Sequence, residues 1–109
     1  MRKVSVRVRK IYFDQIVAGT KPFELRSYTP FWIKRLLWDP PKIAVFVCGP
    51  KTHQRWIRKI KVGRPVEFLG CDLSEQGKQD ISTELCIAIY LGKQVIQNEQ
   101  RTIDGDEKW

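Results

Sequence analysis

The links between the apolar runs of this chain limit its fold more than any other feature of the sequence. Runs of strand length lie at residues 43–48, 52–62, 65–69 and 85–91, and a turn or a polar segment joins each to the next. Consecutive strands with such links favour a small antiparallel barrel or a strongly bent sheet over a parallel one. The 109 residues suffice for one compact domain with a single core. We therefore expect an α+β domain with a small β-barrel of five to six mostly antiparallel strands and two short helices.

Two further strands are expected near the N-terminus. Residues 3–9 alternate strictly, with Val4, Val6 and Val8 on one face and Ser5, Arg7 and Arg9 on the other. This pattern predicts a half-buried strand with a basic outer face. Residues 21–27 are predicted to form the second strand, since a proline is tolerated among the first residues of a strand.

The later runs differ in how clearly they indicate a structure. Residues 43–48, I-A-V-F-V-C, predict a central strand that is buried on both faces. Residues 52–62 fit a helix or a strand, and the Gly-Pro turn before them favours the strand of a hairpin. A short strand is expected at 65–69 and a polar connection at 72–80. Residues 95–97 are a candidate continuation of the strand at 85–91.

Two amphipathic helices are expected, one before and one after the strand at 21–27. Apolar residues four apart predict a helix over residues 11–18, and Gly19 is its expected C-terminal cap. A second helix is expected to begin after Thr29, a good N-cap, with Pro30 in the first helical position. Four large aromatic residues are assigned to the core: Phe31, Trp32, Trp38 and Phe46.

Cysteine and histidine usage gives no sign of a metal site. Cys48, Cys71 and Cys86 show no C-x-x-C spacing, and His53 is the sole histidine. Cys48 and Cys86 lie in apolar runs and are expected to be buried thiols, while His53 is expected in a loop or turn. The sequence has no apolar run of membrane-spanning length and no secretory signal at its start. These features predict a reduced, cytoplasmic protein that needs no metal or cofactor and contacts no membrane.

The charge of the chain is concentrated in its first two thirds. Residues 1–71 hold 16 lysines and arginines against 4 aspartates and glutamates, a net charge of +12. Residues 72–109 hold 4 against 8, a net charge of −4. So basic a segment favours a polyanionic partner, and a merely solvated basic surface is the alternative. The acidic end either balances this charge or shields the basic face.

Three charged side chains are predicted to meet at the start of the second strand. Side chains alternate along a strand, so Glu24 and Arg26 point to the same side. Lys21 follows the bend at Gly19, where its long stem can turn toward them. The three charges are expected to converge on one pocket at the barrel rim. The residue types alone leave open a plain, exposed ion pair between Glu24 and Arg26.

The stretch Y-F-D-Q-I-V-A-G-T-K-P-F-E-L-R, residues 12–26, resembles the signature of the ASCH domain (activating signal cointegrator homology), a branch of the PUA-like β-barrels. That signature is a short helix ending in a small residue and glycine, followed by G-x-K-x-x-E-x-R on the next strand. Its four positions are filled here by Gly19, Lys21, Glu24 and Arg26. The resemblance covers about residues 3–62, and the rest of the chain only in general shape. It implies a PUA-like barrel with a cleft that takes RNA or a modified nucleotide.

The resemblance also implies candidate chemistry. Some relatives are amidohydrolases that deacetylate N4-acetylcytidine with the motif lysine, a threonine three residues later and a distant glutamate; others are ribonucleases, and several only bind. Lys21 matches the lysine, but Glu24 fills the threonine position. A paired glutamate would hold Lys21 charged, so Glu24 is the better general base of the two candidate catalytic residues. Glu75, Asp80 and Glu84 are candidates for the distant acid by chain order alone.

The predicted ligand contacts fall into two sets. Lys21, Glu24, Arg26 and Tyr28 are expected to line the cleft, although Tyr28 suits a packing role equally well. Lys34 and Arg35 would extend the basic face. Cations that neutralise phosphates, with Trp56 to stack on an unpaired base, are expected at Arg7, Arg9, Lys51, Arg55, Trp56, Arg58, Lys59, Lys61 and Arg64.

The leading hypothesis is a single ASCH-type domain over residues 1–97, with a polar C-terminal tail at 98–109. It would bind RNA, single-stranded nucleic acid or a modified nucleoside. The alternatives are a hydrolase of the same fold, acting on an acylated nucleoside or on RNA, and a protein-interaction module that uses the basic face. The oligomeric state and the choice between RNA and DNA are left open.

Overall fold

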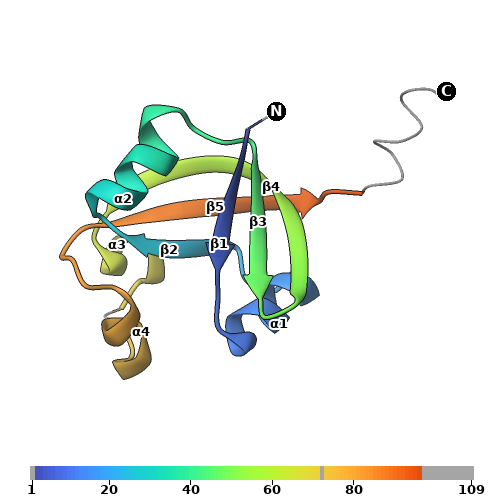
Figure 1. Cartoon of the computed structure of the whole chain (residues 1–109). Helices are drawn as coiled ribbons and strands as arrows, with labels where there is room; N and C mark the ends of the chain where they lie inside the picture. The colour runs from blue at the N-terminus through green and yellow to red at the C-terminus, as the bar shows by residue number, and fades with distance from the viewer. Residues whose placement is uncertain (1, 72, 97–109) are drawn as a thin grey trace, which may run out of the picture.

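The chain folds around one strongly curled sheet of five strands (Figure 1). The computed structural model describes residues 2–71 and 73–96. The strand order is β1-β3-β4-β5-β2, so β1 and β2 are the two edges. The strands are β1 (Lys3–Arg7), β2 (Phe23–Ser27), β3 (Ile43–Cys48), β4 (Lys51–Gly63) and β5 (Cys86–Gln94). The predicted small α+β barrel of mostly antiparallel strands is confirmed, as is the strand over residues 52–62.

One of the four strand pairings is parallel. β1 pairs with β3 in parallel, whereas β3–β4, β4–β5 and β5–β2 are antiparallel. The parallel pair is possible because residues 8–42 return the chain to the end of the sheet where β1 began.

The long strand β4 gives the sheet its curl. Residues 51–56 pair with β3, and residues 55–63 pair with β5. Two register shifts, between Arg55 and Ile57 and between Ile57 and Lys59, interrupt the second ladder. Such bulges bend a strand and increase its twist. Gly92 lies opposite this bend, where a Cβ would come within 3.3 Å of the backbone oxygen of Trp56.

The core fills the concave side of the sheet. Val4 and Val6 of β1 face the same side as Ala44 and Phe46 of β3, their ladder partners. The helices cover this side with Phe13, Ile16 and Leu36, and β5 adds alternate residues from its own concave face. The buried cluster comprises Val4, Val6, Val8, Phe13, Ile16, Leu36, Ala44, Phe46, Ile87, Ile89 and Leu91.

The helical elements are short. They are α1 (Lys10–Ala18), α2 (Pro30–Ile33), the π-helix η1 (Lys34–Trp38), α3 (Pro65–Leu69) and α4 (Glu75–Asp80). Gly19 ends α1 in the left-handed conformation at φ 78°, and the Thr29 hydroxyl caps α2, both as predicted. The second predicted helix continues as η1 without a break in the chain direction.

Two of these helices correct the sequence-based prediction. Residues 65–69 form α3 and not a strand, because Pro65 sits in the first turn and the Glu67 carboxylate accepts a hydrogen bond from the Arg64 N–H at 2.8 Å. The polar connection at 72–80 contains α4, whose N-cap Ser74 accepts from the Gly77 N–H at 3.1 Å. Capping explains the helix at both places, because it favours a helix over the short run at 65–69, and residues 73–80 have no apolar run to favour a strand.

Several expected core residues lie elsewhere. Phe46 is fully buried and Trp32 half-buried, but Phe31 and Trp38 are 53% and 73% exposed, so their assignment to the core was wrong. Cys86 is buried as expected, whereas Cys48 is only half-buried and Cys71 is exposed. Of the side chains on α2 and η1, Leu36 is fully buried, and the others are half-buried or exposed.

The C-terminal part of the chain is described only as far as Ile96. β5 ends at Gln94, so Val95 and Ile96 do not continue the strand, although the Val95 N–H donates to the Gln54 carbonyl at 3.0 Å. Gln97 and the tail predicted at 98–109 lie outside the described residues. None of the helices in the described ranges has the length and apolar content that a membrane crossing needs.

His53 lies on β4 and not in a loop, with its side chain buried on the core side next to Phe13. Burial lowers the pKa of His53 below its ordinary value of 6.5, and the nearby Arg55 cation lowers it further. The unfolded chain therefore binds more protons than the folded protein as the pH falls. Stability contributed by neutral His53 is complete above about pH 6.5 and is lost below it.

We predict that the free energy of unfolding decreases from pH 7 to pH 5 and that His53→Gln flattens this decrease. Urea unfolding at several pH values measures it, and the chain has no second histidine to obscure the result. A wild-type protein whose unfolding free energy is constant over this range would contradict the prediction.

Candidate functional site

A cleft of about 410 Å³ runs along the open edge of β2. Because β2 is an edge strand, Phe23, Glu24 and Leu25 all border it, although they point to different faces of the sheet. Tyr12 and Lys21 lie at its α1 end. The opposite wall comes from the segment that carries α4: Leu69, Cys71, Leu73, Ser74, Gly77, Asp80 and Ile81.

Glu24 is a buried carboxylate between two cations. Its Oε2 lies 2.6 Å from Arg26 Nη2, and its Oε1 lies 3.5 Å from Lys21 Nζ. Glu24 and Arg26 pair across the ladder with Ile89 and Ile87, so both side chains point to the concave side of the sheet. The Glu24 side chain is 7% exposed, against 19% for Lys21 and 21% for Arg26. The structure thus brings the three charges together, Glu24 and Arg26 through the alternation of the strand and Lys21 from its position after the bend at Gly19.

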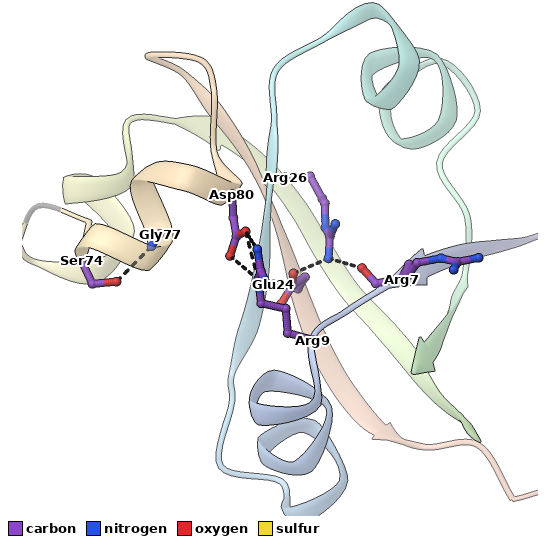
Figure 2. A network of polar contacts seen from close by, with 7 residues as sticks. All are labelled: Arg7, Arg9, Glu24, Arg26, Ser74, Gly77 and Asp80. Carbon is purple, nitrogen blue, oxygen red and sulfur yellow. Dashed lines mark hydrogen bonds and ion pairs between the residues drawn. The ribbon is translucent and has the colours of Figure 1, made fainter. Parts of the chain in front are cut away.

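Arg26 bridges the two edges of the sheet. Figure 2 shows its guanidinium between Glu24 and the Arg7 carbonyl, to which Nη2 donates a hydrogen bond at 2.9 Å. On another side the guanidinium carbon lies 5.4 Å from the ring centroid of Trp32. A second hollow, of about 110 Å³, lies beside this bridge and is bordered by Arg7, Arg9 and Arg26.

Tyr12 was not among the predicted site residues, yet it borders both hollows. Lys21 Nζ lies 4.9 Å from the centroid of its ring. Burial raises the pKa of Tyr12, and the carboxylates of Asp80 and Glu24 raise it further. The hydroxyl therefore keeps its proton at neutral pH and can donate a hydrogen bond to a ligand.

Asp80 links the far wall of the cleft to the rest of the domain. It ends α4 and forms an ion pair with Arg9, with Nη2 and Oδ1 3.0 Å apart (Figure 2). Asp80 also borders both hollows. Of the three acids considered for a distant catalytic group, Glu75 instead pairs with Lys78 and Glu84 with Arg64, both on the exposed surface. Chain order could not distinguish these three residues.

The predicted phosphate contacts do not form a single surface. Arg7 and Arg9 border the smaller hollow, whereas Lys51 to Arg64 are spread along the whole bent strand β4 and its end. Lys59 Nζ lies 4.8 Å from the Tyr90 ring, on the convex side of the sheet. Arg58 and Lys61 are exposed, and Arg64 is paired with Glu84.

Arg55 has a structural position. It pairs with Ala44 on the core side, where Nε donates to the Gly92 carbonyl at 2.7 Å and Nη1 to the Ile16 carbonyl at 2.8 Å. Residues four apart on a regular strand share a face, but the register shifts between Arg55 and Lys59 put Lys59 on the opposite, convex side. Trp56 is half-buried, and Tyr28 is 37% exposed but borders neither hollow.

The described residues show no grouping of three or more histidine, cysteine, aspartate or glutamate side chains that could hold a metal ion. The reactive groups that border the cleft are an ammonium, two carboxylates, a phenol, a hydroxyl and a thiol, from Lys21, Glu24, Asp80, Tyr12, Ser74 and Cys71. The predicted cleft residue Arg26 borders the smaller hollow instead.

We predict that Glu24→Ala lowers the free energy of unfolding by about 3 kcal/mol, because it leaves two partly buried cations without their carboxylate. Glu84→Ala is the matched control, since it removes a carboxylate from an exposed ion pair and should cost less than about 1 kcal/mol. Urea unfolding of both variants measures the difference. Equal losses would show that the Glu24 cluster contributes no more than a surface ion pair.

Comparison with known proteins places the fold. No family model matches the sequence, and no curated protein is similar enough to be counted as a relative. A search of solved structures finds the crystal structure of a serine-to-alanine mutant of ZmASCH from Zymomonas mobilis, with a TM-score of 0.61 and 18% identity. The match covers 92% of this chain and 78% of that one. The chain therefore has the ASCH-domain fold.

Proposed function

We propose that the chain binds RNA, or a modified nucleoside, in the cleft along β2. The observation that carries this proposal is the buried cluster of Lys21, Glu24 and Arg26 beside a cavity with largely apolar walls. Its volume of about 410 Å³ falls in the range of about 300–1,000 Å³ that is typical of small-ligand sites.

The walls of the cleft suit a planar base. Phe23 borders it as part of an aromatic cluster with Phe68 and Tyr90, whose ring centroids lie 6.2 Å and 5.3 Å from that of Phe23. Tyr12 supplies a second ring and Leu25 an aliphatic surface. Apolar walls with few polar groups bury a base and leave its identity to the polar contacts.

Lys21 and Tyr12 are the groups that would read the ligand. The Lys21 ammonium and the Tyr12 hydroxyl both donate hydrogen bonds, and so they select a ligand atom that accepts, such as a base carbonyl. Glu24 Oε1 is covered by its surroundings and has no hydrogen-bond partner among the described residues. Because the carboxylate contacts both Lys21 and Arg26, it orients the two cations. A ligand N–H could reach Oε1 once Lys21 moves aside.

Phosphates of a bound RNA would meet the cations beside the smaller hollow. Arg7 is exposed at this rim, and its side chain points away from Glu24 and Arg26 (Figure 2). Arg9 lies next to it, although part of its charge is offset by Asp80. Lys59 and Lys61 on the convex side and the exposed Arg58 remain proposed phosphate contacts. Arg55 is left out because its guanidinium binds its own chain.

The hydrolase alternative gains one observation from the geometry. Asp80 borders the same cleft as Lys21 and Glu24, so an ammonium and two carboxylates surround one cavity. Such a set could supply a general base and a general acid. In the described conformation, however, Lys21 and Glu24 are engaged with each other at 3.5 Å, which favours the binding function.

We predict that the protein binds a single-stranded RNA with an affinity that falls as salt rises. Each neutralised phosphate lowers the slope of log K against log salt by about 0.7, so contacts to about three phosphates give a slope near −2. Fluorescence anisotropy of a labelled RNA between 50 and 200 mM salt measures this slope. Affinity that does not depend on salt would refute the phosphate contacts.

The cleft is tested with ligands that have no flanking chain. We predict that Lys21→Ala weakens binding of a nucleoside monophosphate, measured by calorimetry, by about tenfold or more, as expected for a charged hydrogen bond worth about 1.5–3 kcal/mol. Lys42→Ala, which removes an exposed lysine just before β3, should have no effect. An unchanged affinity in the Lys21 variant would exclude this cleft as the binding site.

Turnover separates binding from catalysis. For a binding domain we expect no hydrolysis of N4-acetylcytidine or of labelled RNA. Hydrolysis by the wild type that is lost in both Lys21→Ala and Asp80→Asn would instead establish the hydrolase alternative at this cleft.

A further inference from the structure

A second surface with aromatic and cationic side chains lies on α2 and η1. Phe31 is 53% and Trp38 73% exposed, and Lys34 and Arg35 between them are exposed as well. Arg35 lies against the Phe31 ring, and Lys34, Arg35 and Trp38 border one hollow, so the four residues form one surface. Large aromatic side chains that remain exposed on a small domain mark an interaction site.

The contacts within this surface hold its groups in place. The Arg35 guanidinium carbon lies 3.5 Å from the Phe31 ring centroid, and its Nη1 donates to the Phe31 carbonyl at 3.1 Å. Arg2 donates to the carbonyls of Asp39 and Arg35 at 2.6 Å and 3.0 Å, and so it closes the C-terminal end of η1. A hollow of about 420 Å³ is bordered by Arg2, Lys34, Arg35, Trp38 and Asp39.

The charge of this surface favours an anionic partner. Arg2, Lys34 and Arg35 contribute three cations, against the single carboxylate of Asp39 in the same hollow. That carboxylate lies 3.4 Å from Arg2 Nε, which offsets it. Lys34 and Arg35 therefore remain to attract an anion, and Trp38 offers an open ring beside them.

A series of ring contacts connects this surface to the cleft. Arg26, the partner of Glu24, lies 5.4 Å from the Trp32 ring centroid. The Trp32 and Phe31 ring centroids are 5.0 Å apart, and the rings are nearly perpendicular. The Arg35 guanidinium in turn lies against the Phe31 ring. A chain that leaves the cleft past Arg26 would therefore reach α2 and η1 next.

We propose that Phe31, Lys34, Arg35 and Trp38, with Arg2, bind the single-stranded RNA that flanks the nucleotide held in the cleft. This inference rests on the proposed function. Unpaired bases stack on Trp38, while Lys34 and Arg35 contact the phosphates between them. The alternation of rings and cations suits a strand in which bases and phosphates alternate. A lipid surface fits less well, because α2 and η1 together offer only nine residues and a narrow apolar face.

The test compares two probes of different length on one double variant, Lys34→Gln with Trp38→Ala. The first probe is an oligouridylate of about ten nucleotides, within the site sizes of about 4–16 nucleotides of small single-strand-binding barrels. The second is uridine monophosphate. We expect the variant to bind the oligonucleotide at least about fivefold more weakly, with a salt slope smaller by about 0.7, and to bind the mononucleotide like the wild type.

The matched control is Lys93→Gln with Ile11→Ala, which removes one exposed lysine and one exposed apolar side chain (61% exposed) from β5 and α1. It should change neither affinity. Thermal unfolding of both double variants checks that the fold is kept.

The outcomes distinguish this inference from the proposed function. Oligonucleotide binding that is unchanged in the variant, or that falls together with mononucleotide binding, overturns the role of this surface. Wild-type binding of the mononucleotide with no gain for the oligonucleotide overturns it too and leaves the cleft proposal intact. Loss of binding in the variant to vesicles of anionic lipid, with RNA affinity unchanged, would assign the surface to a membrane. A wild type that binds the oligonucleotide but not the mononucleotide would refute nucleotide binding in the cleft and leave the proposed role of this surface standing.

Discussion

The ion pair between Glu24 and Arg26 is the interaction on which this architecture depends. The curl of the sheet brings its two edge strands toward each other, yet in the described part of the chain no backbone ladder joins β1 to β2. A side-chain bridge takes its place, since Glu24 holds Arg26 and Arg26 binds the Arg7 carbonyl on the opposite edge. A planar guanidinium with several fixed donors can make both contacts at once, which a lysine could not do with the same geometry.

The incomplete closure of the barrel also explains where the cleft lies. Every strand of a fully closed barrel has neighbours on both sides, whereas β2 pairs only with β5 among the described residues. Its other edge is covered by the segment with α4. In the described residues this segment is attached by the Arg9–Asp80 ion pair and by side-chain hydrogen bonds of Ser27 and Thr83, and not by a ladder. The space between strand and segment is the cleft, and the same cluster that bridges the edges lies at its base.

Local signals in the sequence were sufficient for much of the fold and for part of the site. Neighbouring residues determine the strand that the alternation of residues 3–9 predicts and the helix end that the glycine after residues 11–18 predicts. The convergence of Glu24 and Arg26 follows from strand geometry, and Lys21 joins them from the bend just before the strand. The contributions of Tyr12 and Asp80 depend on the curl of the sheet, which no local pattern encodes. The position of Arg55 was missed for a similar reason, because it faces the core through its pairing with Ala44. The register shifts that follow it, and that put Lys59 on the other face, arise from pairing β4 with two different strands.

The basic composition of the chain overstates the charge that a ligand would meet. Arg2, Arg26, Arg35 and Arg55 all donate to backbone carbonyls of their own chain, at the edge bridge, at helix ends and at the bend of β4. Arg9 and Arg64 are engaged with carboxylates. Arginine in this protein is therefore largely a structural residue, which its fixed fork of donors suits. An anionic ligand must then be met by exposed lysines, by Arg7 and Arg58, and by the N–H groups that Arg2 and Arg35 do not use within the chain, so its binding depends on where these groups lie and not on the net charge of the domain.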